Sequence, residues 1–70
     1  MAQKLPALRH LRERALMTQE DLAEAASIHR VTLADLERLA NGAHPATIRS
    51  LARALRVKPV DLMRVPEARP

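Results

Sequence analysis

Apolar residues recur at helical spacing along most of the chain, and the pattern is clearest over residues 18–38. The spacing predicts one helix over 19–26, a break over 27–29 and a second helix over about 30–39. The apolar positions fall on one face of each helix: Leu22, Ala23 and Ala26 in the first, Leu33 and Leu36 in the second. Two short helices joined by a three-residue break form the helix-turn-helix pattern.

Polar residues at the start of the first of these helices support its predicted boundary. Thr18 precedes the helix, and Asp21 follows three residues later. This spacing approximates a capping box, in which the Thr18 hydroxyl accepts a free backbone N–H of the first turn. Glu20 and Asp21 also place negative charge at the positive end of the helix dipole.

The remaining apolar stripes predict three more helices, and each begins close to a proline. Pro6, Pro45 and Pro59 each suit a first helical turn, where the missing N–H of proline costs nothing. The predicted helices cover about 6–15, 45–56 and 59–63. Their apolar residues are Leu8, Leu11 and Ala15 in the first, Ile48, Leu51, Ala52 and Leu55 in the second, and Leu62 and Met63 in the third. Residues 1–5 and 65–70 are expected to be loose tails.

Composition supports an all-α fold, a compact bundle of five short helices that contains a helix-turn-helix. Seventy residues allow a single domain, 1–70, with a core expected over about 6–64. The chain has no cysteine and no aromatic residue, so packed Leu, Ile, Val and Ala must form the core. No segment alternates apolar and polar residues as a half-buried strand would.

The charge of the chain is consistent with two interpretations. Twelve Lys and Arg against eight Asp and Glu give a net charge of +4, and ten of the twelve cations are Arg. Arginine suits phosphate and guanine edges, but a charge of this size also serves solubility. We expect no cofactor, no metal site and no enzymatic activity, because nothing pairs a nucleophile with a base. Without a membrane-spanning run or a signal peptide, a cytoplasmic location is expected.

Several short motifs follow one another in a fixed order: Leu11-Arg12, Thr18-Gln19-Glu20-Asp21-Leu22-Ala23, Ile28-His29-Arg30, Leu36-Glu37-Arg38, Pro45-Ala46-Thr47-Ile48 and Leu51-Ala52-Arg53-Ala54-Leu55. In order and spacing they resemble the lambdoid phage repressor and Cro type of helix-turn-helix domain, the XRE-like family. The resemblance covers about residues 8–63. The chain departs from the family at Ser27, where glycine is usual, and in the longer segment 39–42. Ser27 fits the turn if it adopts a left-handed conformation at a small cost.

The resemblance also implies roles for residues outside the second helix of the motif. It pairs Arg12 with Glu37 as a partly buried ion pair that would tie the first helix to the third. The alternative is that both side chains are simply exposed. Gln19 and Thr18, at the start of the second helix, are implied to contact phosphate, and Gln19 to buttress the recognition helix.

Base reading is assigned to the first turns of the helix over 30–39, which such motifs place in the major groove. Arg30 suits O6 and N7 of guanine, with a phosphate contact as its alternative. Val31 suits a thymine methyl, or it merely fills the helix surface, and Thr32 suits a base or a phosphate. Asp35 either accepts from a cytosine amino group or pairs with Arg38, the second being favoured. His29 is a poor N-cap, which suggests a contact duty.

Phosphate contacts are expected where the recognition helix ends and the next helix begins. Backbone amides in the first turn of the helix over 45–56 would assist these contacts. The candidate side chains, beyond Thr18 and Gln19, are Arg38, Asn41, His44 and, more weakly, Thr47 and Arg49.

The leading functional interpretation is a sequence-specific double-stranded DNA binder, a transcriptional regulator of repressor or antitoxin type. The alternative is a protein-interaction module that keeps the fold. The salt dependence of DNA binding distinguishes the two interpretations. The affinity of a DNA binder falls steeply as salt rises, in proportion to the phosphates that it neutralises, whereas an interaction module should show little DNA affinity even at low salt. A small apolar patch suggests a monomer that pairs weakly on DNA; it consists of Val57, Val60, Met63 and Val65.

Overall fold

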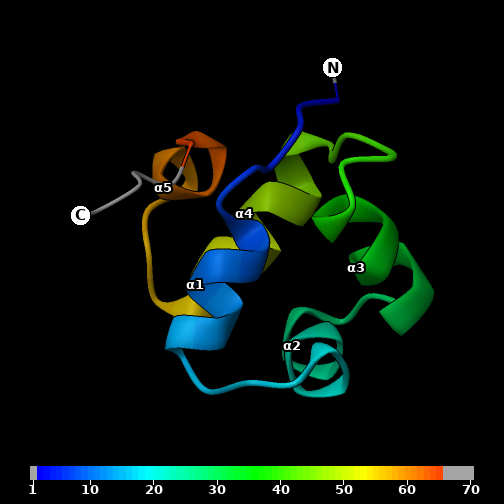
Figure 1. Cartoon of the computed structure of the whole chain (residues 1–70), viewed down its shortest axis with the longest axis vertical. Coiled ribbons are helices and arrows are strands. Elements are labelled where there is room, and N and C mark those ends of the chain that lie inside the picture. Colours follow the sequence, from blue (N-terminus) through cyan, green and yellow to red (C-terminus); the bar gives the residue numbers. More distant parts are fainter. Residues whose placement is uncertain (1, 66–70) are drawn as a thin grey trace.

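A computed structural model describes residues 2–65 and contains five short helices (Figure 1). They are α1 (Leu8–Arg14), α2 (Gln19–Ala26), α3 (Arg30–Glu37), α4 (Pro45–Leu55) and α5 (Pro59–Met63). Within the described residues, the β-type pairing is a single isolated bridge between Gln3 and Ala43. The predicted all-α bundle of five helices is therefore confirmed, and α2 and α3 form the predicted helix-turn-helix.

The helix starts follow the local chemistry of the sequence. The Asp21 N–H donates to the Thr18 hydroxyl, and the Thr18 N–H donates to the Asp21 carboxylate. The donor–acceptor distance is 3.0 Å in each bond. These two bonds are the predicted capping box. The hydrogen bonds from Thr18 lower the pKa of Asp21 below its ordinary value. Pro45 and Pro59 occupy the first helical turns of α4 and α5, as predicted.

Four helices are followed by a residue in the left-handed conformation, and none of these residues is glycine. Their φ angles are 58–60°, and the residues are Leu16, Ser27, Leu39 and Arg56. Ser27 adopts the conformation that the sequence requires of it, with φ 59° and ψ 44°. Each such residue costs roughly 1–2 kcal/mol relative to the right-handed region. The packing of the helices on both sides must therefore offset this cost.

The core receives one fully buried leucine from every helix. Five leucines, one per helix, are 0% exposed: Leu8, Leu22, Leu33, Leu51 and Leu62. Each such burial contributes about 1.5–3 kcal/mol of transfer free energy. Leu36 and Ile48 are also buried, and Met17 packs against the same core, as predicted. α2 packs on both α3 and α4, so the core holds α3 in place.

Three details differ from the sequence prediction. α1 begins at Leu8 rather than in the turn at Pro6, and Ala15 is exposed instead of joining the core stripe. α3 ends at Glu37, two residues before the expected Leu39, because the left-handed Leu39 cannot continue the helix.

The N-terminal segment is not the loose tail that was expected. Leu5 is 1% exposed, and Gln3 exchanges two backbone hydrogen bonds with Ala43. At the other end, Val65 is 77% exposed, and residues 66–70 of the expected C-terminal tail lie outside the described residues.

Candidate nucleic-acid interface

The first turns of α3 present an uninterrupted exposed surface. Leu33 and Leu36 are buried and fix the rotation of the helix. Four residues that the sequence assigned to base reading are consequently exposed, and they lie together at the N-terminal end: His29, Arg30, Val31 and Thr32. α3 also lies at the edge of the molecule, with no helix covering its outer side (Figure 1). A partner can therefore reach this face without any rearrangement of the fold.

The charged residues of α3 differ in whether they form ion pairs. Arg30 is exposed and makes no ion pair with any residue of the described chain, so its donors are available. Asp35 forms an ion pair with Arg38 one turn later, which is the interpretation that the sequence favoured for Asp35. Since this contact uses one nitrogen of the guanidinium, the remaining Arg38 donors can still reach a phosphate.

His29 begins α3 without capping it. Its backbone has the extended conformation of an N-cap, with φ −71° and ψ 142°, but its side chain makes no cap hydrogen bond. The imidazole is exposed and therefore free to contact a ligand. Its position is consistent with the contact duty inferred from the sequence.

A hydrogen-bond network anchors the C-terminal end of α3 to α1 and α2. Arg12 Nε donates to Glu37 Oε2 over 2.5 Å, and Arg12 Nη2 donates to Glu37 Oε1 over 3.2 Å. The same guanidinium donates to the Met17 carbonyl, and Gln19 Nε2 donates to Glu37 Oε1 over 3.0 Å. The bonds to Glu37 raise the pKa of Arg12, which outweighs the opposite effect of burial.

The geometry gives this network a positioning role. Its members come from α1, from the connector before α2, from the start of α2 and from the end of α3. The pair that the resemblance implied between Arg12 and Glu37 is present, and Gln19 makes the buttressing contact. The orientation of the recognition helix is thus set by directional bonds as well as by apolar packing.

The candidate phosphate contacts are brought together only in part. Thr18 and Gln19 lie at the N-terminus of α2. Arg38, Asn41 and His44 are exposed along the α3–α4 loop, and His44 leaves the first turn of α4 without a side-chain cap. Thr47 is half-buried in that turn. Arg49 stands apart, because it lines a hollow beside Pro59 and Met63 of α5.

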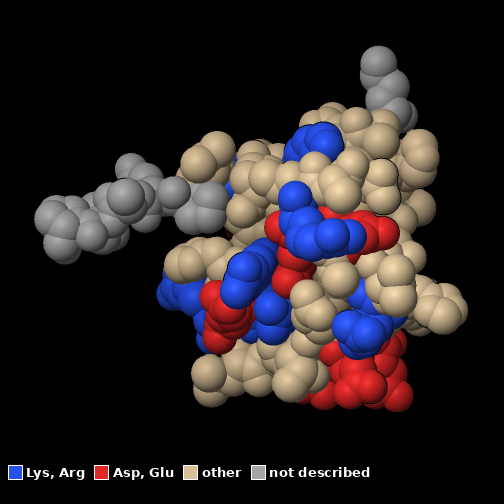
Figure 2. Space-filling model, turned by 45° about the vertical axis from the view of Figure 1, so that its right-hand side comes forward, with Lys and Arg blue, Asp and Glu red and all other residues tan. Residues whose placement is uncertain are grey.

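The charge on this side of the molecule is mixed. Figure 2 shows acidic side chains gathered at the lower end, where Figure 1 places α2, and cationic and acidic side chains intermixed above. The acidic residues of α2 line one shared hollow: Glu20, Asp21 and Glu24. A DNA backbone on this side would meet cations interspersed with acids. Contact therefore depends on where individual arginines lie.

Comparison with known proteins assigns the chain to a family. Residues 7–65 match the family model described as a helix-turn-helix domain. The chain belongs to this family. It is similar to the restriction-modification controller protein C.AhdI from Aeromonas hydrophila, with 33% identity, a TM-score of 0.76 and coverage of 79% of this chain and 83% of that chain. The comparison with curated proteins found no match.

These findings confirm the predicted class of the protein. The XRE/Cro-type resemblance is confirmed, and the protein is a DNA-binding transcriptional regulator of the helix-turn-helix type. In the described residues, no helix has both the length and the apolar character needed to cross a bilayer. In the same part of the chain, no group of three or more His, Cys, Asp or Glu side chains is placed so that it could hold a metal ion.

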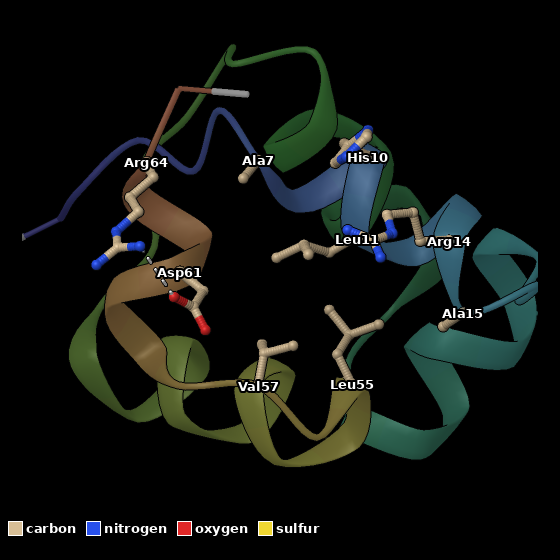
Figure 3. A pocket seen from close by; sticks show the side chains of 9 residues that line it. All are labelled: Ala7, His10, Leu11, Arg14, Ala15, Leu55, Val57, Asp61 and Arg64. Atoms are coloured by element: carbon tan, nitrogen blue, oxygen red, sulfur yellow. Dashed lines mark ion pairs between the residues drawn. The ribbon is translucent and has the colours of Figure 1, made fainter. Parts of the chain in front are cut away.

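One hollow of this helix-turn-helix domain lies away from the recognition helix. It has a volume of about 510 Å³ and lies between α1, the end of α4 and α5, with Leu11, Leu55 and Val57 pointing into it (Figure 3). Arg64 and Asp61 form an ion pair on its rim, with nitrogen and oxygen 3.8 Å apart. Val57 lines this hollow, whereas Met63 lines the other one beside Arg49. The predicted dimer patch is therefore divided between two surfaces.

Sequence reasoning missed two residues beside the interface, Gln3 and Lys4. Lys4 Nζ donates to the Leu39 carbonyl over 2.6 Å, directly after the recognition helix. Gln3 reaches the same loop through its backbone. No periodicity marks either residue, and the only available signal was the apolar Leu5, which the prediction assigned to the tail.

Proposed function

We propose that the protein reads a specific double-stranded DNA sequence with the N-terminal turns of α3 in the major groove. One observation carries this proposal: Arg30 is exposed at the first turn of α3 and has no ion-pair partner in the described chain. Its two-pronged guanidinium matches O6 and N7 of one guanine. His29, Val31 and Thr32 lie around it and would contact neighbouring bases.

Contacts to the phosphate backbone would position the domain on the duplex. We assign them to residues on either side of the reading turns: the exposed Thr18, Arg38, Asn41 and His44, and the half-buried Gln19, with weaker support for Thr47 and Arg49. The uncapped first turn of α4 supports this assignment, because its free N–H groups favour an anion. We assign Asp35 to its ion pair with Arg38 rather than to a contact with a base.

We infer that the described chain, residues 2–65, acts as one DNA-binding domain, which functions by binding rather than by catalysis. The family membership supports this inference. The likeness to a restriction-modification controller supports a regulatory role at an operator. A DNA reader must act in the compartment that holds the DNA, which supports a cytoplasmic location. We also propose that two copies pair weakly on the DNA, without a cofactor.

The decisive experiment selects bound sequences from a random duplex library and then tests variants on the selected site. Arg30→Ala should weaken binding by about 1–3 kcal/mol and relax the preference at one guanine. Arg38→Ala should weaken all duplexes about equally and lower the salt slope by about one. Arg64→Ala is the matched control, because Arg64 is exposed beside α5, on the other side of the molecule from α3.

Two results would count against this proposal in different ways. Uniform weakening of every sequence by Arg30→Ala would make Arg30 a phosphate contact and move base reading to its neighbours. A protein with little DNA affinity even at low salt would instead be an interaction module that keeps the fold.

A further inference from the structure

The N-terminal segment is fastened to the loop that follows the recognition helix. We define residues 2–5 as the N-terminal strap. The Gln3 N–H donates to the Ala43 carbonyl over 2.9 Å, and the Ala43 N–H donates to the Gln3 carbonyl over 2.8 Å. Lys4 Nζ donates to the Leu39 carbonyl over 2.6 Å, and Leu5 is anchored in the core. The strap therefore holds the loop near both of its ends.

The single glycine of the chain lies where the strap crosses this loop. A Cβ atom on Gly42 would lie 2.9 Å from Gln3 N and 3.0 Å from both the carbonyl carbon and the Cβ of Ala2. Gly42 does not have a positive φ, so the turn itself does not demand glycine. The close approach of the strap is what requires glycine, because two of the three atoms that a Cβ would crowd belong to the backbone of the strap.

The loop that is held carries groups assigned to the DNA backbone. Asn41 and His44 are exposed on it, and His44 leads into the uncapped first turn of α4. Connecting loops are normally among the most mobile parts of a fold. A loop that is already ordered loses less conformational entropy when it binds, and its affinity is correspondingly higher.

We propose that the N-terminal strap orders the 38–44 loop for contact with the DNA backbone, with Lys4 as a positioning residue. This inference rests on the proposed function. Lys4 acts through the Leu39 carbonyl, at a residue whose φ of 60° places it in the costly left-handed region. The ammonium therefore stabilises the backbone conformation at the point where the recognition helix ends.

The first test is made without DNA and compares two lysine variants. Lys4→Met removes the ammonium while keeping an unbranched chain, and Lys58→Met makes the same charge change at the start of α5. Hydrogen exchange of the Ala43 N–H should become about threefold to tenfold faster in Lys4→Met, the range expected when one hydrogen bond is lost. Lys58→Met should leave it unchanged. Gly42→Ala should accelerate the same exchange by crowding the strap. Equal exchange of the Ala43 N–H in the wild type, Lys4→Met and Gly42→Ala would overturn the proposal.

The second test uses the selected DNA site and a double-mutant cycle. Lys4→Met should weaken binding to every duplex by about threefold to tenfold and Lys58→Met by less. If Lys4 acts through the loop, its effect should largely vanish in an Asn41→Ala background, because coupled residues are not additive. Full additivity would make Lys4 a direct phosphate contact and overturn the positioning role. Failure of the wild-type protein to bind DNA would overturn the proposed function, while the exchange test would still decide whether the strap orders the loop.

Discussion

The side chains of Arg12 and Glu37 are 12% and 4% exposed, so each depends on the other for its charge to be tolerated. Removal of one partner from a buried pair leaves an uncompensated charge, which typically costs about 3–5 kcal/mol. We expect Arg12→Met to lower the free energy of unfolding by an amount in this range. The double variant Arg12→Met/Glu37→Leu should lower the free energy of unfolding by less than Arg12→Met alone.

Chemical denaturation measures this effect, and α1 offers a matched control. Arg9 pairs with Glu13 on the same helix, but both side chains are more than half exposed. Exposed pairs of this kind contribute about 0–1 kcal/mol, so Arg9→Met should be nearly silent. Equal costs for Arg9→Met and Arg12→Met would show that the network does not hold α3 by its charges.

The capping carboxylate of α2 makes stability depend on pH. Hydrogen bonds from Thr18 lower the folded-state pKa of Asp21 below the ordinary value of 3.8. A group of this kind stabilises the fold above its unfolded pKa, and the contribution is lost as pH falls through the folded pKa. Asp21→Asn should therefore be less stable than wild type above about pH 4, and the difference should shrink at lower pH.

Denaturation curves measured from pH 7 to pH 2 check this prediction. Glu24→Gln, at an exposed position on the same helix, is the control for a general loss of negative charge. A constant difference between Asp21→Asn and wild type over the whole pH range would mean that the capping bond is not linked to ionisation.

At the scale of elements, the apolar face of α3 sets which residues of this helix are exposed. Leu36 is 3% exposed and belongs to the core, so Leu36→Ala should destabilise the protein by roughly 2–5 kcal/mol. Leu16→Ala is the same substitution at a leucine that is 92% exposed, and it should change the free energy of unfolding little. Thermal or chemical unfolding gives both values. A silent Leu36→Ala would mean that α3 is rotated away from the orientation described.

The starts of α2, α4 and α5 were predictable because they are encoded in side chains. Thr18 with Asp21, and the prolines at positions 45 and 59, act on the adjacent turn through their own hydrogen bonds or ring geometry. Helix ends were less predictable. α3 ends at Glu37 because Leu39 is left-handed, and a leucine gives no warning of that conformation.

At the scale of the whole molecule, the exposed face of α3 was predictable and the organisation of its surroundings was not. The burial of Leu33 and Leu36 leaves Val31 exposed on the opposite side, which follows from helical periodicity alone. Arg30 is also exposed, at the first residue of α3. The strap escaped prediction because Gln3 and Ala43 pair through backbone groups, which every residue type shares. Long-range contacts of this kind leave no pattern in the sequence.

The same limit applies to the predicted dimer patch. Its four residues look continuous along the chain, but the fold directs Val57 and Met63 into different hollows. Val60 and Val65 are left 45% and 77% exposed. Two valines offer far less than the roughly 800 Å² per partner that a stable interface usually buries.

We therefore expect a monomer at micromolar concentration and a pair only on suitably spaced DNA. Sedimentation velocity should give the monomer mass for the free protein and, with a duplex that carries a single selected site, the mass of one protein on one duplex. A duplex with two sites about 10 base pairs apart should bind two copies more tightly than one with the second site half a turn further on, because both domains then face the same side of the helix. Val60→Asp should remove that advantage without changing single-site affinity. A stable dimer of the free protein, or equal binding at both spacings, would contradict this assignment of the α5 surface.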